Sequence, residues 1–456
     1  MYTNKRAVPL LIIIAILACF IITITANEAL AFPPSIASPL NAVGSGARAA
    51  GMGGAFIGVA DDATAASWNP GGLIQLETPE ISVVYSNYNA REDYTWSSTV
   101  VGDISSESSA GRLNYMSAAY PFNMFDRNLV VSVNYQHIYD LNNYLDHNTS
   151  TPNGAGCLLT PCTFDELSVS DQTGGLYTIS PALSAQVTPS FSFGMTFNIW
   201  QNIGNDNGWD KTYSVVGSWT YPTLAPNPYI LTDVARTNHE YTFSGFNMHI
   251  GFLWDINEIF TIGGVYKTPF RADIEHSGVD FHEQFDNAGG VFPAPTVNPF
   301  SEKGTMELPA SYGIGIAARF SDNFTMDLDV YQTNWADFKM NLPSTGDINP
   351  VTGLSTATSS SDPTTQVRLG AEYLFIRENT VIPVRAGAFY DPEPREGEPD
   401  KYYGFSFGSG FMWKDLVMDA AYQYRWGSDV KEDIAEPGST ADVVQHLVLV
   451  SAIYHF

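Results

Sequence analysis

Basic residues that alternate with apolar neighbours are the groups in this sequence best suited to bind a ligand. Every second residue around each of them is apolar, so in an extended strand the charged side chain points to the opposite, polar face. An ammonium or guanidinium group on such a face can receive the carboxylate of an amphipathic ligand. We predict that role for Lys267, Arg319, Arg368 and Arg385, and Arg425 has the same parity.

Acidic residues share this polar face and leave a second interpretation open. Asp327, Asp329, Glu372 and Asp419 have the same parity as the basic residues. A charge removed from water requires a partner, so the two sets can form an internal network of ion pairs that only braces a wall. At this point the charged residues can be interpreted either as a ligand site or as a bracing network.

Motifs for catalysis or metal binding are weak in this chain. Gly404 to Gly408 matches the G-x-S-x-G pattern of hydrolases, but Ser406 lies inside an alternating strand rather than on a strand-to-helix elbow. Gly51 to Gly54 resembles part of a dinucleotide fingerprint without a surrounding βαβ unit. Asp61-Asp62 and the Asp327-x-Asp329 pair are explained as well by a solvated loop and a polar wall. We therefore predict no enzyme, no metal and no cofactor.

The N-terminus has the features of an export signal. Lys5 and Arg6 precede an apolar run over 7–24, and Ala29-Leu30-Ala31 is a cleavage site of the A-x-A type. We predict a signal peptide over 1–31, with a retained anchor as the alternative. In an exported chain Cys157 and Cys162 are expected to close a small disulfide loop outside the membrane.

The composition favours a membrane β-barrel over a soluble protein. Among 456 residues only 15% are charged and 13% are aromatic, yet no apolar run after residue 26 is long enough for a spanning helix. The net charge of -27 makes a nucleic-acid partner unfavourable. A chain this apolar without spanning helices can face lipid with strands.

A two-residue period recurs along the chain after residue 79. Phe191, Phe193 and Phe197 alternate with polar residues, which suits one lipid face and one lumenal face. We predict about fourteen antiparallel strands, an even number as bacterial barrels require. They are expected near 79–89, 110–120, 128–138, 174–188, 190–202, 240–255, 258–270, 304–319, 322–335, 364–376, 380–391, 402–413, 415–427 and 445–456.

The connections and the C-terminus indicate the outer membrane. Short connections alternate with long polar ones over 139–173, 203–239, 271–303 and 336–363, as expected for periplasmic turns and outer loops. The last strand alternates and ends on Phe456, like the strand by which the barrel assembly machinery recognises outer-membrane proteins. A soluble sandwich or propeller is not expected to keep two classes of connection over its whole length.

A stretch of small residues before the first strand is predicted to be a hatch that plugs the lumen. Residues 45–73 are mostly Gly, Ala, Ser and Thr, which bury too little apolar area to fold alone. We assign 32–78 to this hatch and 79–456 to the transmembrane β-barrel. The residues predicted to pack or gate the hatch are Gly51, Gly53, Gly54, Asp61, Asp62, Asn69, Pro70 and Gly71.

Three stretches resemble the FadL family of outer-membrane transporters for long-chain fatty acids and other hydrophobic compounds. They are Asp61-Asp62-Ala63 followed by Asn69-Pro70, Leu308-Pro309 followed by 331–338, and 385–394 with the aromatic C-terminal strand behind it. The resemblance implies a fourteen-stranded monomeric barrel with an N-terminal plug. It also implies passive uptake of a hydrophobic ligand, hatch rearrangement and lateral release into outer-membrane lipid through a gap at a kinked third strand.

Two departures from the family pattern matter. Gly71 stands where the family usually has Ala, and the third strand, 129–138, contains neither Gly nor Pro. Pro181 interrupts the adjacent fourth strand and lacks the N–H for a ladder bond. We therefore predict that a lateral opening lies between the third and fourth strands at Pro181.

Other functions remain as alternatives to fatty-acid uptake. A general aqueous porin has no use for an apolar plug of this length. A hatch-containing barrel can also serve as a shuttle or anchor subunit in protein secretion. An outer-membrane lipase would require Ser406 to be reactive.

Overall fold

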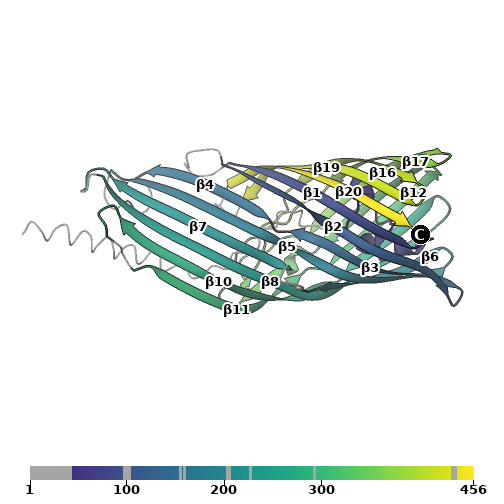
Figure 1. The fold of residues 1–456 in the computed structure, drawn as a ribbon, viewed down its shortest axis with the longest axis horizontal. Coiled ribbons are helices and arrows are strands. Elements are labelled where there is room, and N and C mark those ends of the chain that lie inside the picture. The colour runs from purple at the N-terminus through teal and green to yellow at the C-terminus, as the bar shows by residue number, and fades with distance from the viewer. Residues whose placement is uncertain are drawn as a thin grey trace, which may run out of the picture.

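The computed structural model describes residues 44–95, 104–153, 157, 161–201, 207–224, 228–290, 294–432 and 439–456. The predicted signal peptide, 1–31, lies outside these residues. The described strands form one continuous antiparallel sheet that closes on itself (Figure 1). Within the described residues, no helix is both long and apolar enough to span a membrane.

The chain is a closed barrel of 14 antiparallel strands. The first strand pairs with the last from Glu80 opposite His455 to Thr95 opposite Thr440, which completes the ring. All fourteen predicted strands are present. They are β1 (Glu80–Thr95), β2 (Ile104–Met124), β3 (Arg127–Asp140), β5 (Thr163–Thr188), β6 (Phe191–Trp200), β8 (Tyr229–Asp255), β9 (Phe260–Lys267), β12 (Ser311–Ser321), β13 (Phe324–Thr333), β16 (Thr364–Arg377), β17 (Thr380–Tyr390), β18 (Tyr402–Trp413), β19 (Leu416–Glu432) and β20 (Ser439–His455).

Strands also occupy much of what the sequence predicted to be long loops. These further strands are β4 (Asn143–Pro152), β7 (Gly208–Tyr221), β10 (Phe270–Asp286), β11 (Thr296–Leu308), β14 (Lys339–Leu342) and β15 (Gly346–Ile348). β7 pairs with both β5 and β8, beyond the end of β6. β8 pairs with β9 along its C-terminal part, His249 to Asp255, and with β10 along its N-terminal part, Leu231 to Ser244. The result is a tall extension of one side of the barrel, at the left of Figure 1.

The predicted strand over 304–319 is therefore two strands. β11 ends at Leu308 and pairs with β10, whereas β12 begins at Ser311 and pairs with β9. Pro309 lies at the break, because proline cannot donate the ladder hydrogen bond there.

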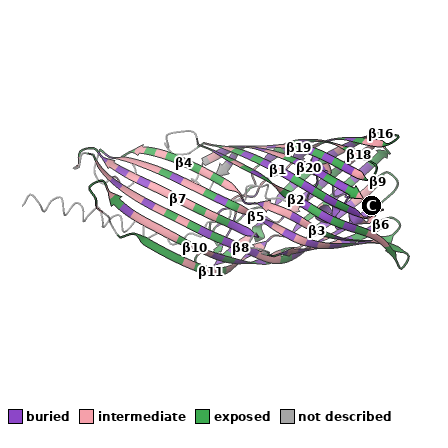
Figure 2. Cartoon of the chain, viewed as in Figure 1, coloured by how far each residue is buried: buried purple, intermediate pink, exposed green. Residues whose placement is uncertain are grey.

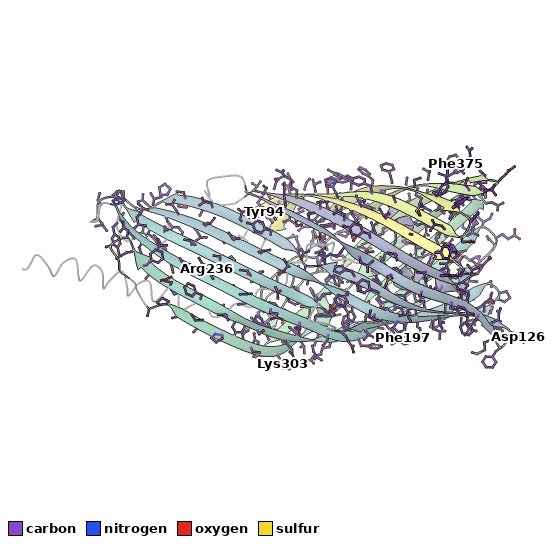
Figure 3. The ribbon with its side chains drawn as sticks, in the orientation of Figure 1. Tyr94, Asp126, Phe197, Arg236, Lys303 and Phe375 are labelled. Atoms are coloured by element: carbon purple, nitrogen blue, oxygen red, sulfur yellow. A yellow bond between two sulfur atoms is a disulfide. The ribbon has the colours of Figure 1, made fainter. Side chains whose placement is uncertain are left out.

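The outward face of β8 marks where the membrane ends. Its C-terminal part presents Phe246 and Trp254 to the outside, while its N-terminal part, which belongs to the extension, presents Arg236 and Glu240. The outer faces of β10 and β11 are also charged, with the exposed ion pair of Glu275 and Lys303 among them. Figure 2 shows the alternation of buried and exposed residues along the strands, and Figure 3 places Arg236 and Lys303 on the extension. The extension therefore projects beyond the bilayer.

Residues 44–76, called here the lumenal segment, lie inside the barrel. They contain α2 (Ala47–Gly51), α3 (Ala65–Trp68) and the 3-10 helix η1 (Pro70–Gln75). α2 contacts β17, β18, β19 and β20, whereas η1 contacts β3, β5, β6 and β8. The segment thus touches walls around the circumference, and its small residues allow the close approach. A Cβ on Gly71 would lie 2.6 Å from the Cα of Phe252, which no side chain can occupy.

Candidate functional site

Two carboxylates of β13 hold the middle of the lumenal segment. Asp329 Oδ2 accepts the backbone N–H groups of Phe56 at 2.7 Å and Ile57 at 2.9 Å. Asp327 Oδ2 accepts the N–H of Gly58 at 3.3 Å. Both aspartates are about as buried as core residues, at 1% exposure. The polar inner face of β13 therefore serves as the docking surface for the segment.

A second set of charges fixes the start of the segment. Arg48 contacts Asp61 within the segment and Glu372 on β16, at 2.9 Å. Glu372 also lies 2.6 Å from Arg385 on β17, and Arg385 lies 2.6 Å from Asp419 on β19. This network joins β16, β17 and β19 to the lumenal segment, so here the bracing interpretation describes the ion pairs.

The predicted Asn-Pro-Gly turn is anchored to the wall. The Asn69 side chain donates to the carbonyl oxygens of Ile57 at 3.0 Å and Phe252 at 2.8 Å, and accepts from Gly71 N at 3.1 Å. Ser192 Oγ donates to the Gly71 carbonyl oxygen at 2.8 Å. These contacts hold the turn against β6 and β8.

A cavity with an aromatic lining is bounded by side chains of β3, β6, β8 and β9, and we call it the lysine cavity. Its empty volume is about 570 Å³, including space open to solvent. The rings of Trp200 and Phe270 stack with centroids 5.4 Å apart. The Lys267 ammonium lies 5.4 Å from the Tyr331 ring centroid. The lining also includes Ile138, His249, Leu308 and Trp335. The cavity thus combines an apolar wall with a cationic group.

A second cavity, the arginine cavity, lies against the lumenal segment. Its empty volume is about 1000 Å³, including open space, and Arg112, Arg368 and Arg425 contribute to its lining. Arg368 donates to the Gly53 carbonyl oxygen at 2.9 Å and lies 3.1 Å from Asp391. Gln136 and Ile138 line both cavities. The two spaces are therefore neighbours along one wall of the lumen.

The wall beside the arginine cavity contains a seam without continuous strand pairing. In the described residues the ladder between β2 and β3 runs from Met124 opposite Arg127 to Tyr115 opposite Gln136, although both strands continue further. Above that point side chains cross the seam. Arg112 Nη2 lies 2.9 Å from Asp140 and its Nη1 lies 2.8 Å from His137 Nε2. A seam closed by side chains can open without breaking a ladder.

The structure corrects three predictions about individual residues. Arg319 has the predicted parity, but its side chain is exposed beside the turn that follows β12 and lines neither cavity. Arg385 is fully buried in its ion pairs and also lines neither cavity. Pairing between the third and fourth barrel strands continues across Pro181, which lies opposite Val133, so no opening occurs there. On the other side of β5, pairing with β6 stops at Ile179 opposite Ile199 and resumes at Ala182 opposite Thr196, so the ladder is interrupted at Pro181 there, where proline lacks the N–H.

Other site predictions fit the positions found. Lys267 lines the lysine cavity and Arg368 lines the arginine cavity. Cys157 and Cys162 form a disulfide near the tip of the extension, as predicted. Among the described residues no cluster of three or more His, Cys, Asp or Glu side chains has an arrangement suited to a metal ion.

Sequence reasoning missed several residues of the cavities. Arg112 and His137 line the arginine cavity, and His249 lines the lysine cavity. His249 lies between outward-facing Met248 and Ile250, so the parity that points Lys267 inward could have found it. Trp200 and Trp335 lie at or near the ends of predicted strands. Their inclusion in one cavity follows from contacts between distant strands, for which no local signal exists.

The family model described as outer membrane protein transport protein (OMPP1/FadL/TodX) matches residues 33–451. No curated protein sequence matches the chain significantly. A Pseudomonas aeruginosa FadL homologue has a similar structure, with a TM-score of 0.60 and 14% identity, over 93% of this chain and 100% of that one.

Two toluene transporters also have similar structures. Pseudomonas putida TodX has a TM-score of 0.54 and 14% identity, over 91% of this chain and 98% of that one. Ralstonia pickettii TbuX has a TM-score of 0.51 and 14% identity, over 91% and 99%. At this identity the likeness shows the barrel fold, whereas the family model covers most of the sequence. The chain therefore belongs to the OMPP1/FadL/TodX family of outer-membrane transport proteins and is an outer-membrane channel for hydrophobic compounds.

Proposed function

We propose that this channel takes up long-chain fatty acids or similar amphipathic hydrophobic molecules by passive diffusion. The observation that carries the proposal is the lysine cavity, where stacked Trp200 and Phe270 provide an apolar surface and Lys267 provides a cation. An alkyl chain can lie against the rings while its carboxylate contacts the ammonium group. We also propose that the channel acts as a monomer.

The path that we propose continues from the lysine cavity to the arginine cavity. The two spaces share Gln136 and Ile138, so a ligand that passes these side chains reaches Arg112 and the N-terminal part of the lumenal segment. Gly46, Ala50 and Gly54 of that segment line the arginine cavity. A local shift of this part would enlarge the passage while Asp329 and Asn69 keep the rest of the segment docked. We propose this as the hatch gating.

Lateral release is proposed at the seam between β2 and β3. The arginine cavity is lined by Arg112, His137 and Asp140, which are the residues that close the seam. Separation of these side chains would join the cavity to the lipid without breaking a strand ladder. The driving force is the transfer of the alkyl chain into the hydrocarbon of the membrane.

Uptake into liposomes tests the carboxylate contact. The Lys267→Gln variant should take up a fatty acid more weakly by roughly 10–100-fold, the value of one hydrogen bond to a charged group, while uptake of the matching fatty alcohol stays unchanged. Lys303→Gln is the matched control, because Lys303 is exposed on the extension. An equal loss for acid and alcohol would contradict the assigned role of Lys267.

Aromatic hydrocarbons are the second candidate. The stacked rings of the lysine cavity favour a flat ligand, and two similar structures bear the name toluene transporter. In the same assay a monoaromatic hydrocarbon should then compete with the fatty acid in the wild type. Uptake of toluene that is independent of Lys267, without fatty-acid uptake, would favour this candidate.

A further inference from the structure

Four ionisable side chains form a chain across the extension of the barrel. Asp280 Oδ1 lies 3.1 Å from His239 Nε2, His239 Nδ1 lies 3.3 Å from His276 Nε2, and His276 Nδ1 lies 2.8 Å from Glu302 Oε1. The two imidazoles are almost fully buried, with 2% and 1% exposure. We call these residues the imidazole chain. It joins β8, β10 and β11 outside the membrane.

The imidazole chain continues into the hairpin at the barrel mouth. Glu302 accepts hydrogen bonds from Ser344 N at 2.9 Å and Ser344 Oγ at 2.6 Å. Ser344 lies in the turn between β14 and β15, and this pair, 339–348, is called the mouth hairpin. Met340 and Leu342 of the hairpin are fully buried in the cluster that includes Leu308 and Trp335.

The mouth hairpin therefore covers residues of the lysine cavity. Leu308 and Trp335 line that cavity, and β14 pairs with β11 over Thr305 to Glu307 only. Such a short ladder gives the hairpin few backbone bonds to the wall. The two hydrogen bonds from Ser344 to Glu302 supplement these backbone bonds at the turn. The protonation and hydrogen bonding of Glu302 therefore affect how firmly the hairpin stays in place.

The imidazole chain has a hydrogen in each of its three hydrogen bonds in only one protonation state. Three hydrogen bonds link the four groups, and each needs one hydrogen. Two neutral imidazoles supply only two hydrogens, and both carboxylates are acceptors when ionised. One extra proton therefore satisfies every link. With two extra protons, one link contains two N–H groups, or an N–H and an O–H, that face each other. With no extra proton, one link has two facing lone pairs and no hydrogen.

Aromatic rings and one basic residue surround the two imidazoles. The Tyr241 ring stacks on His276 with centroids 4.1 Å apart, Phe300 packs edge-on against both imidazoles, and Lys211 lies opposite His239 on β7. Burial lowers the pKa of His276, and its hydrogen bond to Glu302 opposes this effect only in part. Protonation of both imidazoles is therefore disfavoured while the imidazole chain is intact, so strong acid favours the state in which its hydrogen bonds are broken.

We propose that the imidazole chain is a proton-dependent lock that holds the mouth hairpin closed only when it carries one extra proton. The hairpin is then held most firmly at intermediate pH and less firmly in both acid and alkali. The lock itself requires no ligand; its effect on entry to the lysine cavity rests on the proposed function.

Hydrogen–deuterium exchange of the purified barrel in detergent tests the lock directly. Protection factors of 339–348, corrected for intrinsic exchange, are measured from acid to alkaline pH across the ordinary histidine pKa of about 6.5. The wild type should show a maximum, with protection falling roughly tenfold on each side, as expected for one hydrogen bond to a charged group. His276→Gln should have a flat profile, and Ser344→Ala, which keeps the backbone N–H contact to Glu302, should have a smaller maximum than the wild type.

His282→Gln provides the matched control. His282 lies on the same strand and contacts Asp233 at 2.6 Å, outside the imidazole chain, so this variant should keep the maximum. Ser344→Ala removes only a turn hydroxyl and keeps the test usable if the His276 variant does not fold. A flat or one-sided wild-type profile, a maximum of full height in Ser344→Ala, or a maximum in His276→Gln would overturn the proposal. None of these results depends on transport, so the lock can fail while the proposed function stands.

Discussion

Removal of the Asp329 carboxylate should release the middle of the lumenal segment while the barrel stays assembled. In the Asp329→Ala variant the N–H groups of Phe56 and Ile57 lose their acceptor and remain buried. The strand ladders of β13 with β12 and β16 do not depend on this side chain. The perturbation is therefore local to the contact between the segment and the wall.

The magnitude follows from two lost hydrogen bonds. Each is worth about 1–3 kcal/mol according to the charge on the acceptor, so the local loss is about 2–6 kcal/mol. A loss of ~2 kcal/mol already corresponds to roughly a 30-fold increase in the open population. Asp329→Asn keeps one neutral acceptor oxygen and should lie between the alanine variant and the wild type.

Hydrogen–deuterium exchange at residues 56–58 measures this effect in the folded barrel. Protection there should fall at least roughly 30-fold in Asp329→Ala, while the strands of the barrel keep theirs. Asp255→Asn is the control, because Asp255 lies at the exposed end of β8. Unchanged protection at 56–58 in Asp329→Ala would show that the segment is held by other contacts and would refute the docking argument.

Three further changes test other parts of the structure. Gly71→Ala should assemble into a heat-modifiable barrel but lose fatty-acid uptake, because its Cβ would lie 2.6 Å from the Phe252 Cα and displace the turn; normal uptake would contradict the packing argument. Arg112→Gln should speed release from proteoliposomes by loosening the seam, and unchanged kinetics would place release elsewhere. Replacement of both Cys157 and Cys162 by Ser should leave barrel assembly and uptake unchanged, because the disulfide lies in the extension; loss of assembly would contradict this.

The fourteen strands could be predicted because membrane and lumen impose opposite demands on neighbouring residues. Phe191 and Phe193 face lipid while Ser192 faces the lumen, so the pattern is visible in the sequence. The extension lies beyond the bilayer, where both faces of β7 and β10 carry polar residues. The alternation disappears there, so the sequence predicts loops where these strands lie.

The candidate site was less visible in the sequence for a different reason. The alternation correctly predicted that Lys267 and Arg368 point inward. It predicted the same for Arg319, whose side chain is exposed near the end of β12 and lines neither cavity. Cavities arise where distant strands and the lumenal segment meet, as at Gln136 and Ile138. Such contacts depend on closure of the barrel, which no local pattern records.

Native mass spectrometry of the folded barrel, released from detergent, tests the central claim most directly. Wild-type protein should retain an acidic hydrophobic molecule at a ratio of one per chain, identified by fragmentation. Lys267→Gln should lose most of it, while Lys303→Gln keeps it. A wild-type barrel that carries no apolar adduct after incubation with fatty acid, or one that retains it equally without Lys267, would contradict the proposed site.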